Sequence, residues 1–390
     1  MWNMKKYSIN GKVGACIEIK NNNYGSMLQS YATQMLLKDF GLEYEMLTYK
    51  KKYTPLFVLK SIPRVFNRVQ WQDKLQAKKK KDFIKKHPEI TVDVKARNKA
   101  FDGFRERYFT APITTYYGFD ALKKSSDNYV AFLTGSDQLW SPSGLPTNFY
   151  NLKFVQEDKL KISFASSFGV SRIPWYQIRR TRDYLNRIQF ISCREKTGTE
   201  IVLELTGRTV PVVADPTMMY DKSKWDSMLK SEKKIEGDYI FAYFLGDDER
   251  CRKETKKLSD KTGLKIVSIR QYVDADLNFG DIHVKDADPA DFVNLIKNAR
   301  YVCTDSFHGS VFSIINHRQF IVFNRYSDND KASKNTRIEN LCERLGLNRR
   351  FNGDIVNEML REIDYNLVDK KMNAIREETI SYLETAFDAI

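Results

Sequence analysis

The segment Thr304-Asp305-Ser306-Phe307-His308-Gly309-Ser310 lies between two apolar runs, residues 301–303 and 311–315. The first run is typical of a short buried strand, and the second is typical of a helix. A strand that passes into a helix through a Ser/His/Gly turn presents backbone N–H groups at the carboxyl edge of a parallel sheet, where α/β proteins bind anions. The chain has four histidines, so the imidazole of His308 in this turn is a candidate for chemistry.

The alternation of strand and helix around this turn recurs along the chain. Apolar runs that predict strands occupy residues 13–19, 45–49, 129–133, 161–165, 190–192, 239–245, 265–269 and 320–323. Segments with helical spacing of apolar residues include 27–40, 98–108, 249–261 and 289–298. Continuous apolar strands separated by helices indicate parallel sheets covered on both faces. The sequence therefore predicts an α/β protein with two Rossmann-like domains.

The length of the chain, 390 residues, also favours two domains over one. A charged connection at residues 231–237 reads as a linker. We predict an N-terminal α/β domain over residues 1–232 and a C-terminal α/β domain over residues 233–365. Residues 366–390 are predicted to form a helix that docks on the body of the protein, because its apolar residues follow helical spacing.

The pattern of cysteines and the length of the apolar runs indicate in which cellular compartment the protein resides. The five cysteines are scattered and include no CxxC pair, which favours a reducing environment and argues against a structural zinc site. The N-terminus lacks the apolar core of a signal peptide. The longest apolar run, residues 239–245, is too short to span a bilayer. We therefore expect a cytoplasmic protein.

The net charge of +14 is concentrated in residues 50–86, which hold 13 Lys and Arg residues against 2 Asp and Glu residues. We predict that this segment belongs to a basic helical insertion at about residues 50–107. Its apolar and basic stripes consist of Leu59, Ile62, Phe66 and Val69 and of Lys60, Arg64 and Arg68. Such a helix either lies on an anionic membrane surface, at the inner face of the membrane, or packs on its own domain. Nucleic acid is not expected as a partner, because zinc-finger spacing and an aromatic RNA-binding strand are absent from the sequence.

Several motifs together carry a family resemblance. They are Asn23-Tyr24-Gly25, Leu28-Gln29-Ser30-Tyr31-Ala32, Gly135-Ser136-Asp137-Gln138-Leu139-Trp140, Ala165-Ser166-Ser167-Phe168-Gly169, Ser192-Cys193-Arg194-Glu195, Ala214-Asp215-Pro216-Thr217, Asp305-Ser306-Phe307-His308-Gly309 and Thr336-Arg337-Ile338-Glu339. Any one of them is weak evidence, but in this order, between about residues 12 and 350, they resemble the polysaccharide pyruvyl transferase family. The resemblance leaves the basic insertion uncovered.

The resemblance implies a two-domain fold similar to that of GT-B glycosyltransferases, with the active site in the cleft between the domains. It implies transfer of the enolpyruvyl group of phosphoenolpyruvate, as a co-substrate, to a saccharide of a capsule, exopolysaccharide or cell-wall glycan, where it closes as a ketal. No cofactor and no metal are expected. An acceptor carried on a lipid diphosphate at the membrane would fit the basic insertion.

Two other functions stay open at this point. The first is an ordinary GT-B glycosyltransferase that uses a nucleotide sugar. Such an enzyme needs a carboxylate near a turn of the C-terminal domain to hold the ribose, and the turn Ser306-Phe307-His308-Gly309 offers none. The second is a binding module without catalytic activity. Phosphoenolpyruvate turnover separates the proposed transferase from both.

The resemblance also suggests roles for individual residues. His308 is the candidate general acid and base, because imidazole titrates near neutral pH; the alternative is a cap of the following helix. Arg194 is the candidate clamp on the donor carboxylate or phosphate, with a salt bridge to Glu195 as the alternative. Arg337 is a second candidate anion clamp or else a surface arginine.

The remaining candidates would hold the two substrates. Ser306 and Gly309, with the helix N-terminus that follows, are candidates for phosphate binding through backbone N–H groups. Asp137 and Gln138 are candidates for binding sugar hydroxyls, with a helix cap and a core hydrogen bond as the alternatives. Asn23 and Gly25 are expected to line the acceptor side, unless the asparagine merely caps the next helix.

Overall fold

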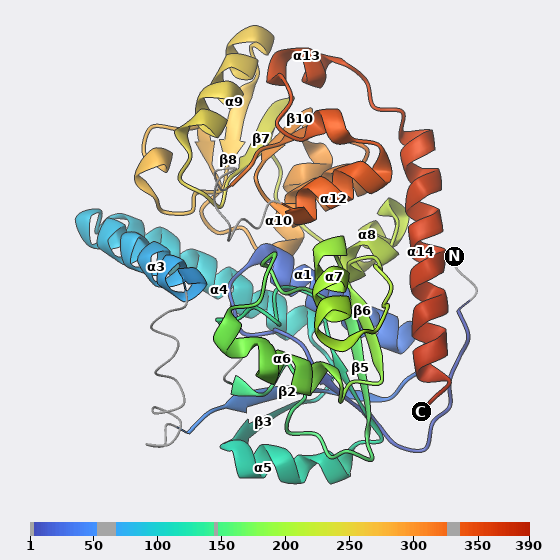
Figure 1. The fold of residues 1–390 in the computed structure, drawn as a ribbon. Helices are drawn as coiled ribbons and strands as arrows, with labels where there is room; N and C mark the ends of the chain where they lie inside the picture. Colours follow the sequence, from blue (N-terminus) through green and yellow to red (C-terminus); the bar gives the residue numbers. More distant parts are fainter. Residues whose placement is uncertain (1–3, 53–67, 144–146, 326–335) are drawn as a thin grey trace.

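The computed structural model describes residues 4–52, 68–143, 147–325 and 336–390 (Figure 1). Within these residues, six parallel strands form a first sheet in the order β3-β2-β1-β4-β5-β6. The strands are β1 (Val13–Cys16), β2 (Tyr44–Lys50), β3 (Ile113–Tyr117), β4 (Ala131–Thr134), β5 (Leu160–Ser166) and β6 (Phe190–Cys193). The order reverses direction at β1 and β4, and ligands of open α/β sheets bind at such a switch point.

A second parallel sheet has the order β11-β10-β7-β8-β9. Its strands are β7 (Tyr239–Tyr243), β8 (Lys265–Ser268), β9 (Ile282–His283), β10 (Tyr301–Thr304) and β11 (Gln319–Val322). Strands β7 and β10 are buried throughout, as their continuous apolar sequences predicted. The predicted α/β class with two parallel sheets is confirmed. The exact domain limits stay a prediction.

Helices separate the strands and cover the sheets. They are α1 (Tyr24–Asp39), α3 (Arg68–Lys86), α4 (Ile90–Tyr108), α5 (Phe119–Lys124), α6 (Ile178–Leu185), α7 (Lys196–Thr206), α8 (Lys222–Met228), α9 (Glu249–Thr262), α10 (Pro289–Asn298), α11 (Phe307–Ile315), α12 (Thr336–Leu345), α13 (Ile355–Leu360) and α14 (Tyr365–Phe387). Helix α1 begins three residues before the predicted start at residue 27. Gly25 and Ser26 therefore lie in its first turn, where the side chain of Asn23 caps the helix.

The N-terminal end of α1 connects the two sheets. Tyr24 stacks on Phe292 of α10, with ring centroids 5.0 Å apart, and meets Tyr243 of β7 edge-on at 5.7 Å. Its buried hydroxyl donates a hydrogen bond to the carbonyl of Ala287 at 3.0 Å. One continuous apolar core contains residues from both sheets and from α1. The first turn of α1 is thereby fixed against the second sheet.

Helix α14 runs along the side of the molecule and contacts the first sheet and its connections (Figure 1). Arg376 donates to the carbonyls of Met218 and Tyr220, and the hydroxyl of Tyr382 donates to the carbonyl of Ser163 at 2.6 Å. The hydroxyl of Thr379 accepts a hydrogen bond from the backbone N–H of Ala214 at 2.9 Å. These contacts hold the segment that leads into Asp215.

The described residues of the predicted basic insertion are 50–52 and 68–107, and they include the helices α3 and α4. Leu59, Ile62, Phe66, Lys60 and Arg64 of the predicted stripes lie outside the described residues. The C-terminal part of α3 is anchored, because Phe83 is buried in a small cluster with Ile90 and Tyr272. In the part of the chain that the structure describes, no helix is both long enough and apolar enough to cross a membrane.

Replacing Thr379 by valine tests how α14 supports the site. Thr379→Val leaves the buried N–H of Ala214 without its acceptor, so we expect the free energy of unfolding to fall by about 1–3 kcal/mol. Thr385→Val is the matched control, because that exposed hydroxyl makes only the same bond to its own helix, to Ser381. We expect a change within about 0.5 kcal/mol for the control. Urea unfolding measures both, and equal effects would contradict the supporting role of Thr379.

Candidate active site

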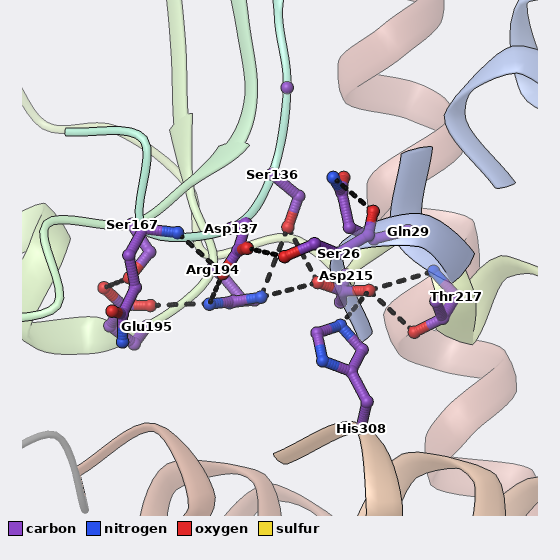
Figure 2. Close-up of polar contacts among 12 residues, drawn as sticks. Ser26, Gln29, Ser136, Asp137, Ser167, Arg194, Glu195, Asp215, Thr217 and His308 are labelled. Atoms are coloured by element: carbon purple, nitrogen blue, oxygen red, sulfur yellow. Dashed lines mark hydrogen bonds and ion pairs between the residues drawn. The ribbon is translucent and has the colours of Figure 1, made fainter. Parts of the chain in front are cut away.

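The candidate site lies where the ends of β4, β5 and β6 meet the first turn of α11 from the second sheet. Asp137 follows β4, Ser167 follows β5 and Arg194 follows β6, while His308 is in α11. Figure 2 shows their side chains converging, with His308 approaching from the opposite side of the group to Arg194. Residues that are far apart in sequence and belong to two sheets therefore meet at one position.

Asp215 is at the centre of this arrangement, and its carboxylate is fully buried. One oxygen, Oδ2, accepts hydrogen bonds from Arg194 Nη1 at 2.8 Å and Ser136 Oγ at 2.7 Å. The other, Oδ1, accepts from the backbone and hydroxyl of Thr217 and lies 3.6 Å from His308 Nε2. Burial alone raises the pKa of Asp215, but the charges of His308 and Arg194 and the hydrogen bonds lower it well below its usual range. Asp215 is therefore a carboxylate.

Arg194 is a buried cation with three carboxylates near it. Besides the contact with Asp215, its guanidinium lies 3.8 Å from Glu195 and 3.9 Å from Asp137. Burial lowers its pKa, but the three carboxylates outweigh burial and raise it, so Arg194 stays charged. Among the described residues, its Nε and Nη2 atoms are buried without a hydrogen-bond partner. Buried guanidinium N–H groups of this kind are suited to bind an anionic ligand.

A second guanidinium, that of Arg337 on α12, lies close to the first. The ring of Phe307 is 4.6 Å from the guanidinium carbon of Arg194 and 6.0 Å from that of Arg337. Burial and the positive charge of Arg194 lower the pKa of Arg337 to about 10, against the opposite effect of Glu195 and Asp137. Two buried cations that repel each other favour a bound anion, which would relieve that repulsion.

The two remaining carboxylates differ in their environments. Glu195 accepts a hydrogen bond from Ser167 Oγ at 2.7 Å, but burial raises its pKa in spite of Arg194 and Arg337. Asp137 accepts hydrogen bonds from Ser26 Oγ and from the backbone N–H of Gln138. Burial raises the pKa of Asp137, yet the charge of Arg194 and the bond from Ser26 lower it overall. Asp137 is thus an ionised acceptor, whereas Glu195 takes up a proton more readily.

His308 is held between Asp215 and the first turn of α1. Its side chain is buried, and in the described part of the chain its Nε2 has no hydrogen-bond partner within 3.5 Å. Gly25 packs against the other side of the imidazole, where an added Cβ would lie 2.0 Å from Nδ1. The absence of a side chain at residue 25 is therefore what allows the imidazole to lie beside Asp215.

The structure brings His308, Arg194, Arg337 and Asp137 together, and the other predicted residues lie around them. Asn23 accepts a hydrogen bond from Ser26 N at 3.1 Å and caps α1, which is the alternative that the sequence left open. Ser306 caps α11 by accepting from Gly309 N at 3.2 Å, so this amide already has an acceptor. The backbone of Gly169 passes close to the side chain of Gln138. A Cβ added to Gly169 would lie 2.9 Å from that side chain. The substrate-binding roles of these residues stay predictions.

The sequence alone indicates no binding or catalytic role for Asp215 or Ser26. Asp215 belongs to one of the quoted motifs, but an aspartate before Pro-Thr is the usual signal for a cap of a short helix, and Asp215 also caps one here. Its second role depends on Arg194 and His308, which are distant in sequence. Glu195 was considered only as the partner of Arg194, and the structure places Asp215 closer to that arginine.

Among the described residues, no group of three or more His, Cys, Asp or Glu side chains is arranged to hold a metal ion. The expectation that the reaction needs no metal stays a prediction. What the site offers instead is a set of charged groups: two guanidiniums, an imidazole with a carboxylate behind it, and two further carboxylates. These side chains are chemically able to bind an anionic group and to transfer protons.

Comparison with solved structures identifies the fold. The solved structure of Staphylococcus aureus MnaA with UDP superposes with a TM-score of 0.50, at 12% identity over 98% of each chain. The UDP-GlcNAc 2-epimerase of Neisseria meningitidis bound to UDP-GlcNAc gives 0.48, at 9% identity over 96% of this chain and 100% of its own. Arabidopsis thaliana UGT89C1 with UDP-L-rhamnose gives 0.48, at 11% identity over 96% and 98%. The fold is the GT-B fold.

The family follows from the sequence. The family model described as polysaccharide pyruvyl transferase matches residues 23–327. No curated protein sequence matches the chain. The chain therefore belongs to the polysaccharide pyruvyl transferase family, as the motifs predicted, and the family implies a transferase that acts on a saccharide.

Gly25→Ala tests the close approach of α1 to His308. The new methyl group would occupy the space of the imidazole, so we expect transferase activity to fall by about 100-fold or more, because small displacements of reacting groups have large effects. Gly103→Ala in α4 is the control, because its Cβ meets no atom within 4 Å; it is expected to keep full activity and to raise stability by about 0.5–1 kcal/mol. Activity in Gly25→Ala equal to that of the control would contradict the placement.

Proposed function

We propose that the protein transfers the enolpyruvyl group of phosphoenolpyruvate to two hydroxyls of a saccharide and closes it as a pyruvate ketal, in the assembly of a capsule, exopolysaccharide or cell-wall glycan. The observation that carries the proposal is the buried pair of His308 and Asp215 beside the guanidiniums of Arg194 and Arg337. The proposed proton-transfer group, His308, is thereby buried next to two cations. Family membership supports the transferase class.

Arg194 and Arg337 are proposed to hold the donor. Phosphoenolpyruvate carries a carboxylate and a phosphate, and planar guanidinium groups bind both in a bidentate manner. The N–H groups on Nε and Nη2 of Arg194 supply donors for one of these groups. Arg337, across the ring of Phe307, supplies a second cation. The anion would also offset the repulsion that lowers the pKa of Arg337.

His308 is proposed to move protons during the reaction. Protonation of carbon 3 of the enol leaves carbon 2 electron-poor, and one sugar hydroxyl forms a bond to carbon 2. The bond between carbon 2 and the phosphate oxygen then breaks, and the second hydroxyl closes the ketal as inorganic phosphate leaves. Of the two hydroxyl protons, one becomes part of the new methyl group and the other leaves with phosphate, so no water is consumed. The carboxylate of Asp215, with Oδ1 3.6 Å from Nε2, is proposed to orient the imidazole.

Asp137 is proposed to bind the acceptor. Its carboxylate is ionised and already fixed by Ser26 and by its own following N–H, so it can accept a further hydrogen bond from a sugar hydroxyl. It also lies 3.9 Å from Arg194, which brings the acceptor close to the proposed donor position. Acceptor binding is also proposed for the sequence neighbours of Ser26 and Asp137, which are Asn23, Gly25 and Gln138.

A lipid-diphosphate-linked acceptor would bring the enzyme to an anionic membrane surface, and α3 is proposed to make that contact. Figure 1 shows α3 extending from one side of the molecule. Trp71 and Leu75, one turn apart, are each 56% exposed, and Lys78 and Lys81 are exposed further along the helix. Exposed aromatic and aliphatic side chains beside lysines are typical of helices that lie on membranes.

The proposed reaction is tested by release of inorganic phosphate from phosphoenolpyruvate with a panel of nucleotide-linked and lipid-linked sugars, and by a product mass increase of one pyruvate less one water. We expect His308→Gln to lower kcat by about 100-fold or more, because it removes the proton-transfer group. Arg194→Lys is expected to raise KM for phosphoenolpyruvate, because it removes the bidentate fork.

His317→Gln is the control for these variants, because His317 follows the C-terminal end of α11, is half exposed and pairs with Asp369 of α14. Turnover of a nucleotide sugar without phosphoenolpyruvate would overturn the proposal in favour of a GT-B glycosyltransferase. Turnover that is unchanged in His308→Gln would overturn the role of the histidine. Absence of turnover with every acceptor would favour a binding module.

Membrane contact is tested by sedimentation with vesicles. We expect binding to vesicles that contain phosphatidylserine, and about tenfold or greater weakening in the double variant Lys78→Glu/Lys81→Glu, since each lysine near an anionic surface contributes about 1 kcal/mol. The control is Lys253→Glu/Lys257→Glu on α9, which makes the same change in charge at exposed positions elsewhere. Equal weakening in both variants would show attraction by net charge alone and would contradict a specific contact through α3.

A further inference from the structure

A separate cavity of about 170 Å³ lies at the carboxyl ends of β1 and β2. We call it the β1–β2 cavity; its walls include Ile17, Glu18, Thr48, Tyr49, Phe149 and Tyr150. None of these residues belongs to the group around Asp215. The carboxyl edge of a parallel sheet is the ordinary place for ligands in an α/β protein, and the volume is sufficient for one sugar ring.

The β1–β2 cavity is next to Asp137. Strand β1 pairs with β4, and Ile17 packs over Gly135, where an added Cβ would lie 2.6 Å from the Ile17 side chain. Trp140, in the turn that contains Asp137, donates its indole N–H to the carbonyl of Tyr150 at 3.1 Å. Burial raises the pKa of Tyr150 well above its usual value, and the charges of Glu18 and Asp137 act in the same direction. The cavity and the candidate active site therefore share a border.

The polar groups of the cavity are held in place. The Oε2 atom of Glu18 accepts a hydrogen bond from the hydroxyl of Tyr150 at 2.9 Å. The other oxygen, Oε1, accepts from the backbone N–H groups of Lys20 at 2.7 Å and Asn21 at 3.2 Å. The fixed carboxylate can accept further hydrogen bonds from the hydroxyls of a ligand, and the oxygen of Tyr150, whose O–H is donated to Glu18, can accept one as well. A sugar carries hydroxyl groups on neighbouring carbon atoms, and two such hydroxyls can form hydrogen bonds to these two side chains.

Aromatic rings form one wall of the cavity. Tyr49 and Phe149 lie with ring centroids 5.9 Å apart and an interplanar angle of 29°. Tyr150 meets Phe149 edge-on, with centroids 4.9 Å apart. Flat aromatic surfaces supply apolar contact for the C–H face of a sugar, while a few placed polar groups fix its orientation.

We propose that the β1–β2 cavity binds one monosaccharide unit of the acceptor, with Glu18 and Tyr150 bonded to its hydroxyls and the Tyr49–Phe149 wall against its ring. These residues select the acceptor, and Asp137 receives the part of the saccharide that continues toward the reacting centre. The identification of the bound sugar as the acceptor rests on the proposed function. Binding of a sugar in the cavity is independent of any reaction.

Two variants test the cavity without disturbing the proposed catalytic groups. Glu18→Gln retains an oxygen for the N–H groups of Lys20 and Asn21 and removes the charge that would bind hydroxyls. Tyr150→Phe removes one hydroxyl and keeps the ring. Tyr117→Phe is the matched control, because Tyr117 is 58% exposed at the end of β3 on the same sheet. Circular dichroism and thermal unfolding check that each variant is folded.

Binding is measured first, without phosphoenolpyruvate, by saturation-transfer NMR with methyl glycosides of glucose, galactose, mannose, N-acetylglucosamine and N-acetylmannosamine. We expect at least one glycoside to bind to the wild type and to the Tyr117→Phe control. Its affinity should fall by about tenfold or more in Glu18→Gln, because a hydrogen bond to a charged group is lost, and by less in Tyr150→Phe. Failure of every glycoside to bind, or equal affinity in all variants, would overturn the inference.

Turnover separates this inference from the proposed function. If phosphoenolpyruvate is used, Glu18→Gln should raise KM for the acceptor by about tenfold or more and leave KM for phosphoenolpyruvate unchanged. Turnover by Glu18→Gln with an unchanged KM for the acceptor would overturn the role of the cavity and would leave the proposed function unaffected. Glycoside binding that depends on Glu18, in a protein that never uses phosphoenolpyruvate, would support the cavity and overturn the proposed function.

Discussion

The contact of the Asp215 carboxylate with Arg194 on one side and His308 on the other is the interaction on which the candidate site depends. Arg194 belongs to the first sheet and His308 to a helix of the second, so this carboxylate joins the two halves of the molecule through charge. A buried carboxylate is tolerated only when it is paired and hydrogen-bonded, and both of its oxygens meet that condition. The backbone before Asp215 is in turn fixed by α14 through Thr379.

The sequence was sufficient for the fold because the relevant signals are local. Continuous apolar runs predicted the strands other than β3 and β9, and helical spacing predicted α1, α9, α10, α11 and α14 to within a few residues. It located α4 but placed its start eight residues too late, and it did not predict α5, α6, α8, α12 or α13. The first turn of α1 was missed because Gly25 and Ser26 carry no apolar side chain that would extend the helical pattern. The basic stripes of residues 59–66 stay a prediction, since those residues lie outside the described part of the chain.

The site was predicted only in part, for a physical reason. His308 and Arg194 carry chemistry in their own side chains, so their types and motifs identified them. The function of Gly25 depends on its lack of a side chain beside an imidazole from the other sheet, and no local pattern encodes that distance. Asp215 has a complete local explanation as a helix cap, which concealed its contacts with two residues distant in sequence. Tertiary contacts of this kind appear only when the two sheets are brought together.

The charges in the site connect donor binding with proton transfer. Asp137 and Asp215 have lowered pKa values and stay ionised, whereas burial raises the pKa of Glu195 and Arg337 has a pKa of only about 10. An added anion raises the pKa of every neighbouring group. A bound enol phosphate would therefore stabilise the charged form of Arg337 and favour protonation of Glu195. Binding of such a donor and the protonation of the site would then be coupled through Arg337 and Glu195.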